Sequence, residues 1–204
     1  MVAVLAAGGV VTGVWWKPWQ SVDLPDSACW GSLSTADYKA LAGSSGKVGV
    51  AQDGEIDGPV AYAAFMGDCR LYEVGRAPGY DIVDVQVDSA ETDAGQAYLA
   101  PFGDGTAKAV SFGADADGWI TPSGSAVDAY LRCDYQAAIA TKETANPFVR
   151  VLVSGTLGLS ASSAAQVRQA RVDIAWKMAK AVAHRLPCSN AVRFADAPPT
   201  VPTA

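Results

Sequence analysis

The chain has 204 residues, of which 50% are hydrophobic and 18% are charged, and its formal net charge is −6. A chain of this length can build one domain with a sizeable core. The acidic balance and the lack of any Lys- and Arg-rich run argue against nucleic-acid binding, which needs clustered basic side chains to replace counterions.

The N-terminal segment from Met1 to Trp16 contains no charged residue, and Lys17 with Pro18 closes it. As a helix it would span about 24 Å, less than the roughly 30 Å hydrocarbon core of a bilayer. It also lacks the positive region expected before a signal or anchor, so we expect the true start to lie upstream of Met1. We interpret residues 1–17 as an uncleaved membrane anchor. A cleaved signal and a buried core segment are the alternatives.

Residues 20–27 are polar and contain a proline, which predicts that residues 18–27 are a linker to an extracytoplasmic domain over residues 28–195. Within the stretch ACWGSLSTADYKALAG, Ser34 is a good N-cap for a short helix over residues 36–41, and Gly43 is its C-cap. The Pro-rich tail over residues 196–204 has no apolar period and is predicted to be disordered.

Apolar and alternating runs predict a β-sheet. The most regular run begins at Ile82, where Val83, Val85 and Val87 alternate with polar residues, as in a strand with one buried and one solvent-facing side. Other expected strands cover residues 48–51, 61–74, 105–112, 119–121 and 148–153.

The two halves of the chain share an order of features. Each has a cysteine, a polar loop and then a strand of alternating valines, and GDCRLY around Cys69 resembles LRCDYQ around Cys133. We treat residues of about 28–97 and 105–190 as candidates for an internal duplication, with chance similarity of two hairpins as the alternative.

The stretch from Ser162 to Cys188 has the clearest helical period in the chain. Five apolar residues recur at steps of seven or four, which places them on one stripe; Ser162 or Ser163 caps the start, and Pro187 stops the helix. We expect an α+β fold in which an antiparallel sheet packs against this long C-terminal helix. The stripe residues are Val167, Ile174, Met178, Val182 and Leu186.

The four cysteines, Cys29, Cys69, Cys133 and Cys188, are widely spaced and form no CxxC pair. This spacing gives no zinc-ligand pattern, so two disulfides in an oxidising compartment are favoured over four buried thiols. We favour Cys29–Cys69 and Cys133–Cys188, each of which ties a helix end to a strand. The two other connectivities remain open.

Two acidic turns resemble fragments of calcium loops. One contains Asp115 and Asp117, and the other contains Asp53, Glu55 and Asp57. Both lack the terminal glutamate of an EF-hand loop, so we interpret them as turns between strands and leave ion binding at Asp115 and Asp117 open.

No assembled catalytic set is visible. His184 is the one histidine and lies near the helix end, where a cation complements the helix dipole. No GxSxG frame, dinucleotide fingerprint or Walker loop accompanies it. We therefore assign no catalytic, cofactor-binding or metal-binding residue, and we expect that the protein is not an enzyme.

The N-terminal anchor, the alanine-rich composition, ACWG-SLS followed by LAG, the cysteine in GDCRLY and the late HRLPCSN together resemble uncharacterised envelope proteins of actinobacteria. The resemblance covers most of residues 28–190. It implies a membrane-anchored or secreted protein whose disulfide-containing α+β domain lies outside the cytoplasm. It implies a binding role and carries over no catalytic residue.

We expect a single-pass membrane protein whose extracytoplasmic domain binds a protein or another envelope component. One alternative is a small-molecule or lipid carrier with an apolar cavity between helix and sheet. A less favoured alternative is an envelope hydrolase whose catalytic carboxyl groups come from the acidic cluster formed by Asp84, Asp88, Glu91 and Asp93.

Overall fold

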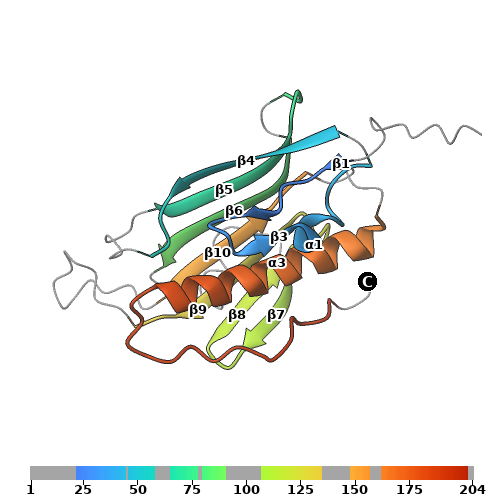
Figure 1. The fold of residues 1–204 in the computed structure, drawn as a ribbon. Helices are drawn as coiled ribbons and strands as arrows, with labels where there is room; N and C mark the ends of the chain where they lie inside the picture. Colours follow the sequence, from blue (N-terminus) through green and yellow to red (C-terminus); the bar gives the residue numbers. More distant parts are fainter. Residues whose placement is uncertain are drawn as a thin grey trace, which may run out of the picture.

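The protein is described here from a computed structural model, which describes residues 22–44, 46–57, 65–77, 80–90, 107–134, 148–156 and 162–201. Within these ranges a large sheet is packed against one long C-terminal helix (Figure 1). In chain order the elements are β1 (Val22–Asp23), β2 (Ser27–Ala28), β3 (Leu33–Ser34), α1 (Thr35–Tyr38), β4 (Gly46–Gly54), β5 (Phe65–Glu73), β6 (Asp81–Ala90), β7 (Lys108–Gly113), β8 (Ala116–Ile120), β9 (Ala126–Arg132), β10 (Phe148–Ser154) and α3 (Ala164–Arg185).

The strand order in the large sheet is β1-β4-β5-β6-β10-β9-β8-β7. Two antiparallel meanders, β4–β5–β6 and β7–β8–β9–β10, join where β6 pairs with β10 and Val87 lies opposite Val151. Only the short β1 pairs in parallel, with the start of β4, among the described strands. The predicted α+β fold with a sheet against the long helix is confirmed. The internal duplication stays a prediction.

Alternation of side chains explains why one face of the sheet is buried. In β6 Val83, Val85 and Val87 are fully buried, while Asp84 points to the opposite face. The same alternation recurs in β10, where Val151 is one of three fully buried valines. These valines form the core together with the apolar stripe of α3.

The sequence of α3 contains its own start and stop signals. The backbone N–H of Gln166 donates to the Ser163 hydroxyl, and the Gln166 side chain accepts from the backbone N–H of Ser163, which completes a capping box. The helix ends at Arg185, two residues before Pro187. The stripe predicted from periodicity is confirmed, because all five of its members are buried: Val167, Ile174, Met178, Val182 and Leu186.

Arg171 is the exception on the buried face of α3. Its side chain is 1% exposed and donates to the carbonyl oxygens of Gly124, at 2.5 Å, and Thr156, at 3.3 Å. It therefore ties the β8–β9 turn and the end of β10 to the helix. Burial lowers the pKa of this guanidinium.

The N-terminal elements cover the other half of the buried face. Ser34 caps α1 as predicted, but the helix ends at Tyr38, so it is shorter than the predicted helix over residues 36–41. Three consecutive residues, Cys29, Trp30 and Gly31, have positive φ angles of 51°, 57° and 73°. This left-handed turn places Cys29 against β5.

Two predicted boundaries differ from the structure. Residues 22–23 of the predicted linker form β1 and residue 27 belongs to β2, so the folded part begins earlier than residue 28. The tail that was predicted to be disordered contacts α3. The Gln169 side chain donates to the carbonyl of Pro199 at 3.0 Å and accepts from the backbone N–H of Val201 at 3.0 Å. The C-terminal segment is therefore packed against α3 as far as Val201.

The predicted anchor at residues 1–17 lies outside the described residues. In the part of the chain that is described, no helix combines the length and the apolar character needed to cross a membrane.

Candidate functional site

Of the four acidic residues that the hydrolase alternative would use, the two that the structure describes lie on the face of β6 opposite the core. Asp84 and Asp88 share this face and are four residues apart, about 13 Å along a strand. Glu91 and Asp93 lie outside the described residues. The two described carboxyls therefore belong to separate clusters.

Asp84 faces two further carboxylates. Burial, followed by the negative charge of Asp68 and then that of Asp81, raises the pKa of Asp84 from 3.8 to about 6. Arg70 opposes this rise, and Gln86 donates to Asp84 at 3.2 Å. A proton on Asp84 would let it donate a hydrogen bond to Asp68.

Asp88 lies beside a buried ion pair. The Arg150 guanidinium donates to both oxygens of Asp128, at 2.8 Å and 3.0 Å, and lies 3.8 Å from Asp88. Asp128 is 1% exposed and also accepts from Tyr130 at 3.4 Å. Burial raises the pKa of both Asp88 and Asp128 in spite of Arg150. This cluster joins β6, β10 and β9 by their polar faces and has a structural role.

A cavity of about 290 Å³ lies at the β5–β6 hairpin. It is open to solvent and takes its walls from the polar face of β4 and β5 and from the chain between β5 and β6. Its lining residues are Ala51, Arg70, Tyr72, Glu73, Arg76, Ala77, Tyr80 and Asp81.

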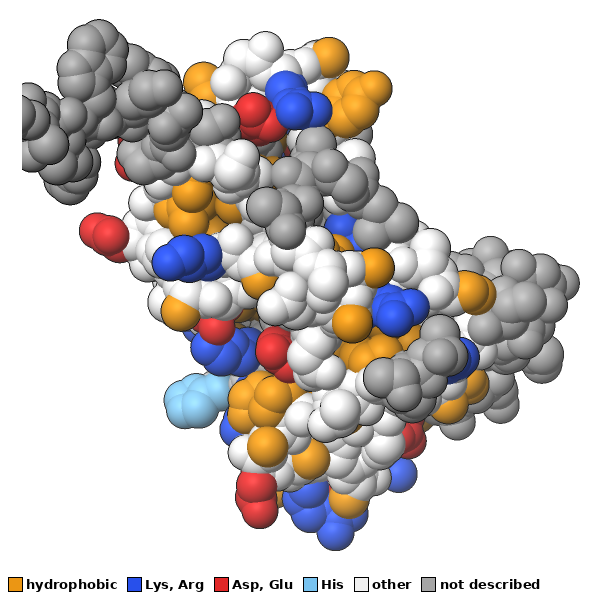
Figure 2. Space-filling view, turned by 90° about the vertical axis from the view of Figure 1, so that its right-hand side faces the viewer, with side chains coloured by type: hydrophobic (Ala, Val, Ile, Leu, Met, Phe, Trp, Pro, Cys, Tyr) orange, Lys and Arg blue, Asp and Glu red, His pale blue; other side chains and the backbone are white. Residues whose placement is uncertain are grey.

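Exposed aromatic side chains gather around this cavity. Among the described residues, the exposed large hydrophobic side chains are Tyr72 (38%), Val74 (51%) and Tyr80 (49%), and all three lie at this hairpin. Figure 2 shows hydrophobic, basic and acidic side chains together at the top of the molecule, the height at which Figure 1 draws the hairpin. Exposed apolar groups rimmed by charges are typical of binding sites.

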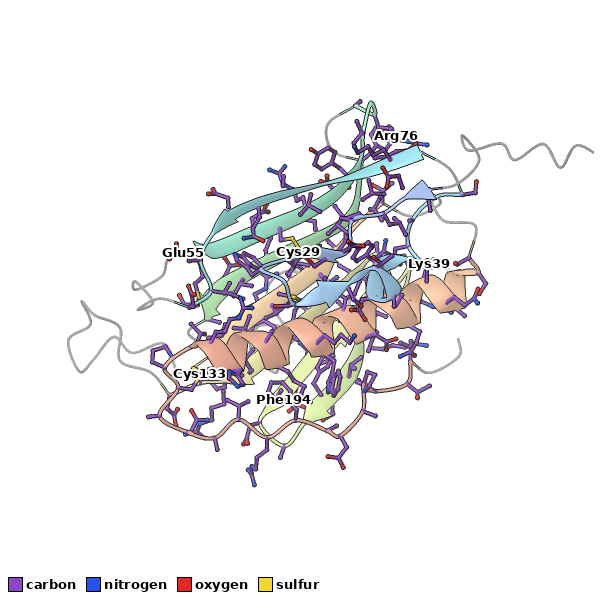
Figure 3. All side chains as sticks on the ribbon, in the orientation of Figure 1. Cys29, Lys39, Glu55, Arg76, Cys133 and Phe194 are labelled. Atoms are coloured by element: carbon purple, nitrogen blue, oxygen red, sulfur yellow. A yellow bond between two sulfur atoms is a disulfide. The ribbon has the colours of Figure 1, made fainter. Side chains whose placement is uncertain are left out.

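The charged groups of the cavity are held by neighbours in the same hairpin. Arg70 donates to Asp68 at 3.0 Å, and Arg76 forms an ion pair with Glu73. Both arginine side chains stay about half exposed, at 51% and 46%. Figure 3 shows Arg76 at the top of the molecule, beside β4 and the hairpin. Each guanidinium group is therefore held in place by an ion pair, while part of it stays accessible to solvent.

In the acidic turns, Asp115 and Asp53 have hydrogen-bond partners within the protein. Arg193 donates to both oxygens of Asp115, at 2.7 Å and 3.0 Å, and this contact lowers the pKa of Asp115 to about 2. Asp117 is exposed on β8, and Asp53 accepts from the backbone N–H of Gly54 at 3.0 Å. Within the described ranges no three His, Cys, Asp or Glu residues cluster as metal ligands.

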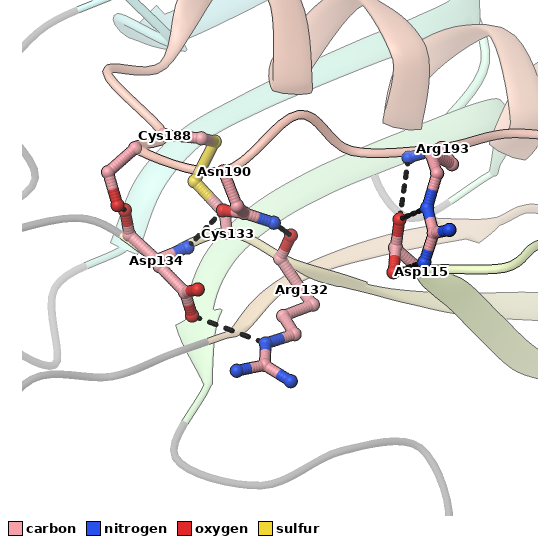
Figure 4. Close-up of polar contacts among 8 residues, drawn as sticks. Asp115, Arg132, Cys133, Asp134, Cys188, Asn190 and Arg193 are labelled. Carbon is pink, nitrogen blue, oxygen red and sulfur yellow. Dashed lines mark hydrogen bonds and ion pairs between the residues drawn. A yellow bond between two sulfur atoms is a disulfide. The ribbon is translucent and has the colours of Figure 1, made fainter.

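The cysteines form Cys29–Cys69 and Cys133–Cys188 disulfides, the connectivity favoured from the sequence. The second bridge is reinforced by Asn190, which accepts from the backbone N–H of Asp134 at 2.7 Å and donates to the Arg132 carbonyl at 2.9 Å (Figure 4). Two disulfides indicate a domain that folds in an oxidising, extracytoplasmic or secreted setting.

His184 is exposed in the last turn of α3, where the sequence placed it. The residues that line the hairpin cavity were not singled out from the sequence. A signal was present, since LYEV-GRAPGY sets two tyrosines and Arg76 around a turn between two strands. Comparison with protein-family models, curated proteins and solved structures gives no match to this chain.

Proposed function

We propose that this protein is an extracytoplasmic binding protein of the cell envelope, held at the membrane by residues 1–17, that recognises a protein or another envelope component. The resemblance to actinobacterial envelope proteins supports this location, as do the disulfides. The observation that carries the binding role is the presence of two exposed rings, Tyr72 and Tyr80, in the lining of the hairpin cavity. Exposed tyrosines are favourable contact residues, since each offers a large apolar ring with a polar tip.

A hydrolase is the second candidate because of one observation. Asp84 has a pKa of about 6 and lies beside the carboxylates of Asp68 and Asp81, an environment that suits a general acid or base. We favour binding because the hairpin cavity is lined by Asp81 but not by Asp84. The carrier alternative gains no support from the described helix–sheet contacts, which are made by fully buried side chains such as Ile174 and Met178.

The location is tested by fractionating cells that produce the full chain and labelling free thiols without prior reduction. We expect the protein in the membrane fraction, with its four cysteines protected from the label. Recovery in the cytosol with reactive thiols would overturn the proposed location.

The binding role is tested with purified cell-envelope material and the full chain in detergent. Tyr80→Ala removes an exposed ring from the cavity, whereas Val74→Ala trims a side chain of the same hairpin that does not line it. We expect Tyr80→Ala to reduce the bound fraction and Val74→Ala to leave it near the unmodified level. Equal binding by all three proteins would show that the hairpin cavity is not the binding site.

A further inference from the structure

The charges that line the hairpin cavity cancel. Arg70 and Arg76 contribute two positive charges, while Glu73 and Asp81 contribute two negative charges. An anionic ligand would have to approach the two carboxylates, and a cationic ligand would have to approach the two guanidinium groups. The lining therefore favours a ligand without net charge.

The same groups supply both donors and acceptors. A guanidinium has five N–H donors, and Arg70 directs its Nε–H to Asp68, which leaves its terminal nitrogens for other partners. Arg76 likewise forms its ion pair through Nε, with Glu73. The carboxylates of Glu73 and Asp81 are acceptors. A wholly apolar ligand would remove these charged groups from water without replacing their hydrogen bonds, at a cost in free energy.

The tyrosines add apolar surface to this polar lining. The ring of Tyr72 lies over Gly49, because a Cβ built on Gly49 would come within 2.6 Å of its Cζ. Ala51 and Ala77 are the small residues of the lining. The volume of about 290 Å³ lies at the lower limit of small-molecule sites, which suits one ring-sized unit.

We propose that the hairpin cavity binds one sugar unit of a neutral envelope glycan. A sugar ring has an apolar C–H face that can pack on the rings of Tyr72 and Tyr80. Its hydroxyl groups each donate and accept, so they match the guanidinium and carboxylate groups of Arg70 and Asp81 without requiring a net charge. This inference rests on the proposed binding function and names its ligand.

A peptide fits this site less well. A bound extended peptide distributes its donors and acceptors along a strand or groove, with side-chain pockets at alternate positions. Here the donors, acceptors and aromatic rings surround a single small space at the end of a hairpin. The geometry therefore points to recognition of one polar ring.

The test uses the full chain in a detergent without a sugar headgroup, with binding measured by isothermal titration calorimetry. The probes are neutral oligosaccharides of hexose and N-acetylhexosamine, matched oligosaccharides that contain uronic acid, and an uncharged polar peptide. We expect the neutral oligosaccharides to bind best. We expect Tyr80→Ala to weaken their binding at least about tenfold, and Val74→Ala to have little effect.

The outcomes separate this inference from the proposed function. Stronger binding of the acidic oligosaccharide or the peptide would overturn the neutral-glycan assignment. So would failure of all three probes while envelope material still binds in a manner that depends on Tyr80. Binding of envelope material that does not depend on Tyr80 would overturn the hairpin cavity as the binding site, and no binding of envelope material at all would overturn the proposed function itself. Tyr80→Phe, which keeps the ring, is expected to retain more affinity than Tyr80→Ala, provided that both variants melt like the unmodified protein.

Discussion

The ring of Tyr72 on β5 lies across Gly49 on β4, at the position where the two strands place these residues opposite one another. A Cβ at Gly49 would lie 2.6 Å from Cζ and 2.8 Å from the hydroxyl oxygen of Tyr72. Glycine weakens a strand, and an aromatic residue on the partner strand can cover it. Gly49 therefore fixes the position of a ring that lines the hairpin cavity.

Gly49→Ala is expected to move the Tyr72 ring and weaken ligand binding with little loss of stability. The atoms that the new methyl group meets belong to the far end of the Tyr72 side chain, which can rotate away. Binding of the best oligosaccharide probe, measured by calorimetry, should fall by about tenfold or more.

The control is the same substitution in a Tyr72→Ala background, where the clash is absent. There Gly49→Ala should leave binding unchanged and raise the free energy of unfolding by up to about 1 kcal/mol, because alanine loses less backbone entropy than glycine. A fall in binding of equal size in both backgrounds would show that Gly49 acts independently of Tyr72.

Asp84→Asn is expected to stabilise the protein at neutral pH. The pKa of Asp84 is about 6 in the folded protein and lies above its ordinary value of 3.8. Between these values the folded state holds a proton that the unfolded state has lost, so stability falls as the pH rises toward 6. After allowance for solvent screening, we expect a gain of about 1 kcal/mol at pH 7.5 from removing this charge.

Thermal melts of Asp84→Asn and the unmodified protein at pH 4 and pH 7.5 test this expectation. The melting temperatures should differ at pH 7.5, by about 2–4 °C, and converge near pH 4, where Asp84 is largely protonated. Asp117→Asn, at an exposed position on β8, serves as the control for removal of a negative charge. A gain at pH 7.5 of equal size in this control would attribute the effect to net charge.

The core strands and the long helix could be predicted because their apolar periodicity is set by residues close together in the chain. The alternation in β6 and the stripe of α3 both follow from periodicity, so Val85 and Ile174 could be assigned to the core in advance. The disulfide pairing was favoured from the sequence only as one of three connectivities.

The remaining features depend on strand register and on distant contacts. Nothing local to Arg171 predicts burial, since its partners Gly124 and Thr156 come from two other parts of the chain. Gly49 and Tyr72 are likewise opposed only through the β4–β5 register. The walls of the hairpin cavity depend on the same register, although the two tyrosines around its turn are visible in the sequence. The ordered tail depends on a contact between Gln169 and Val201.

Arg150→Met is expected to destabilise the protein strongly at neutral pH. It leaves Asp128 buried without its bidentate partner, and breaking such a pair typically costs about 3–5 kcal/mol. Burial already raises the pKa of Asp128, and loss of Arg150 removes an interaction that opposes this rise. In the folded variant Asp128 should therefore stay protonated to a higher pH. The loss in free energy of unfolding should shrink as the pH falls.

Urea unfolding at pH 5 and pH 7.5 measures this deficit. The double variant Arg150→Met with Asp128→Asn should recover part of the lost stability at pH 7.5, because no buried carboxylate then lacks a partner. Arg132→Met removes a 60% exposed arginine from a surface ion pair with Asp134 and should cost less than about 1 kcal/mol. A deficit independent of pH would show that Arg150 acts mainly through packing.

The junction between the end of β9 and the chain after α3 is closed twice, by Cys133–Cys188 and by Asn190. The disulfide closes a loop with a sequence separation of 55, worth about 4 kcal/mol in the chain-entropy model. We expect Cys133→Ser with Cys188→Ser to lose up to this amount, and Asn190→Ala to lose about 1–3 kcal/mol.

The two closures should be coupled. Without the disulfide the chain after α3 can separate from β9, so that Asn190 makes its two hydrogen bonds for less of the time. Asn190→Ala should then cost less in the disulfide-free background than in the unmodified protein. A double-mutant cycle from urea unfolding measures this difference. An additive cycle would show that Asn190 holds the junction independently, and unchanged stability without the two cysteines would contradict the structural role of the bridge.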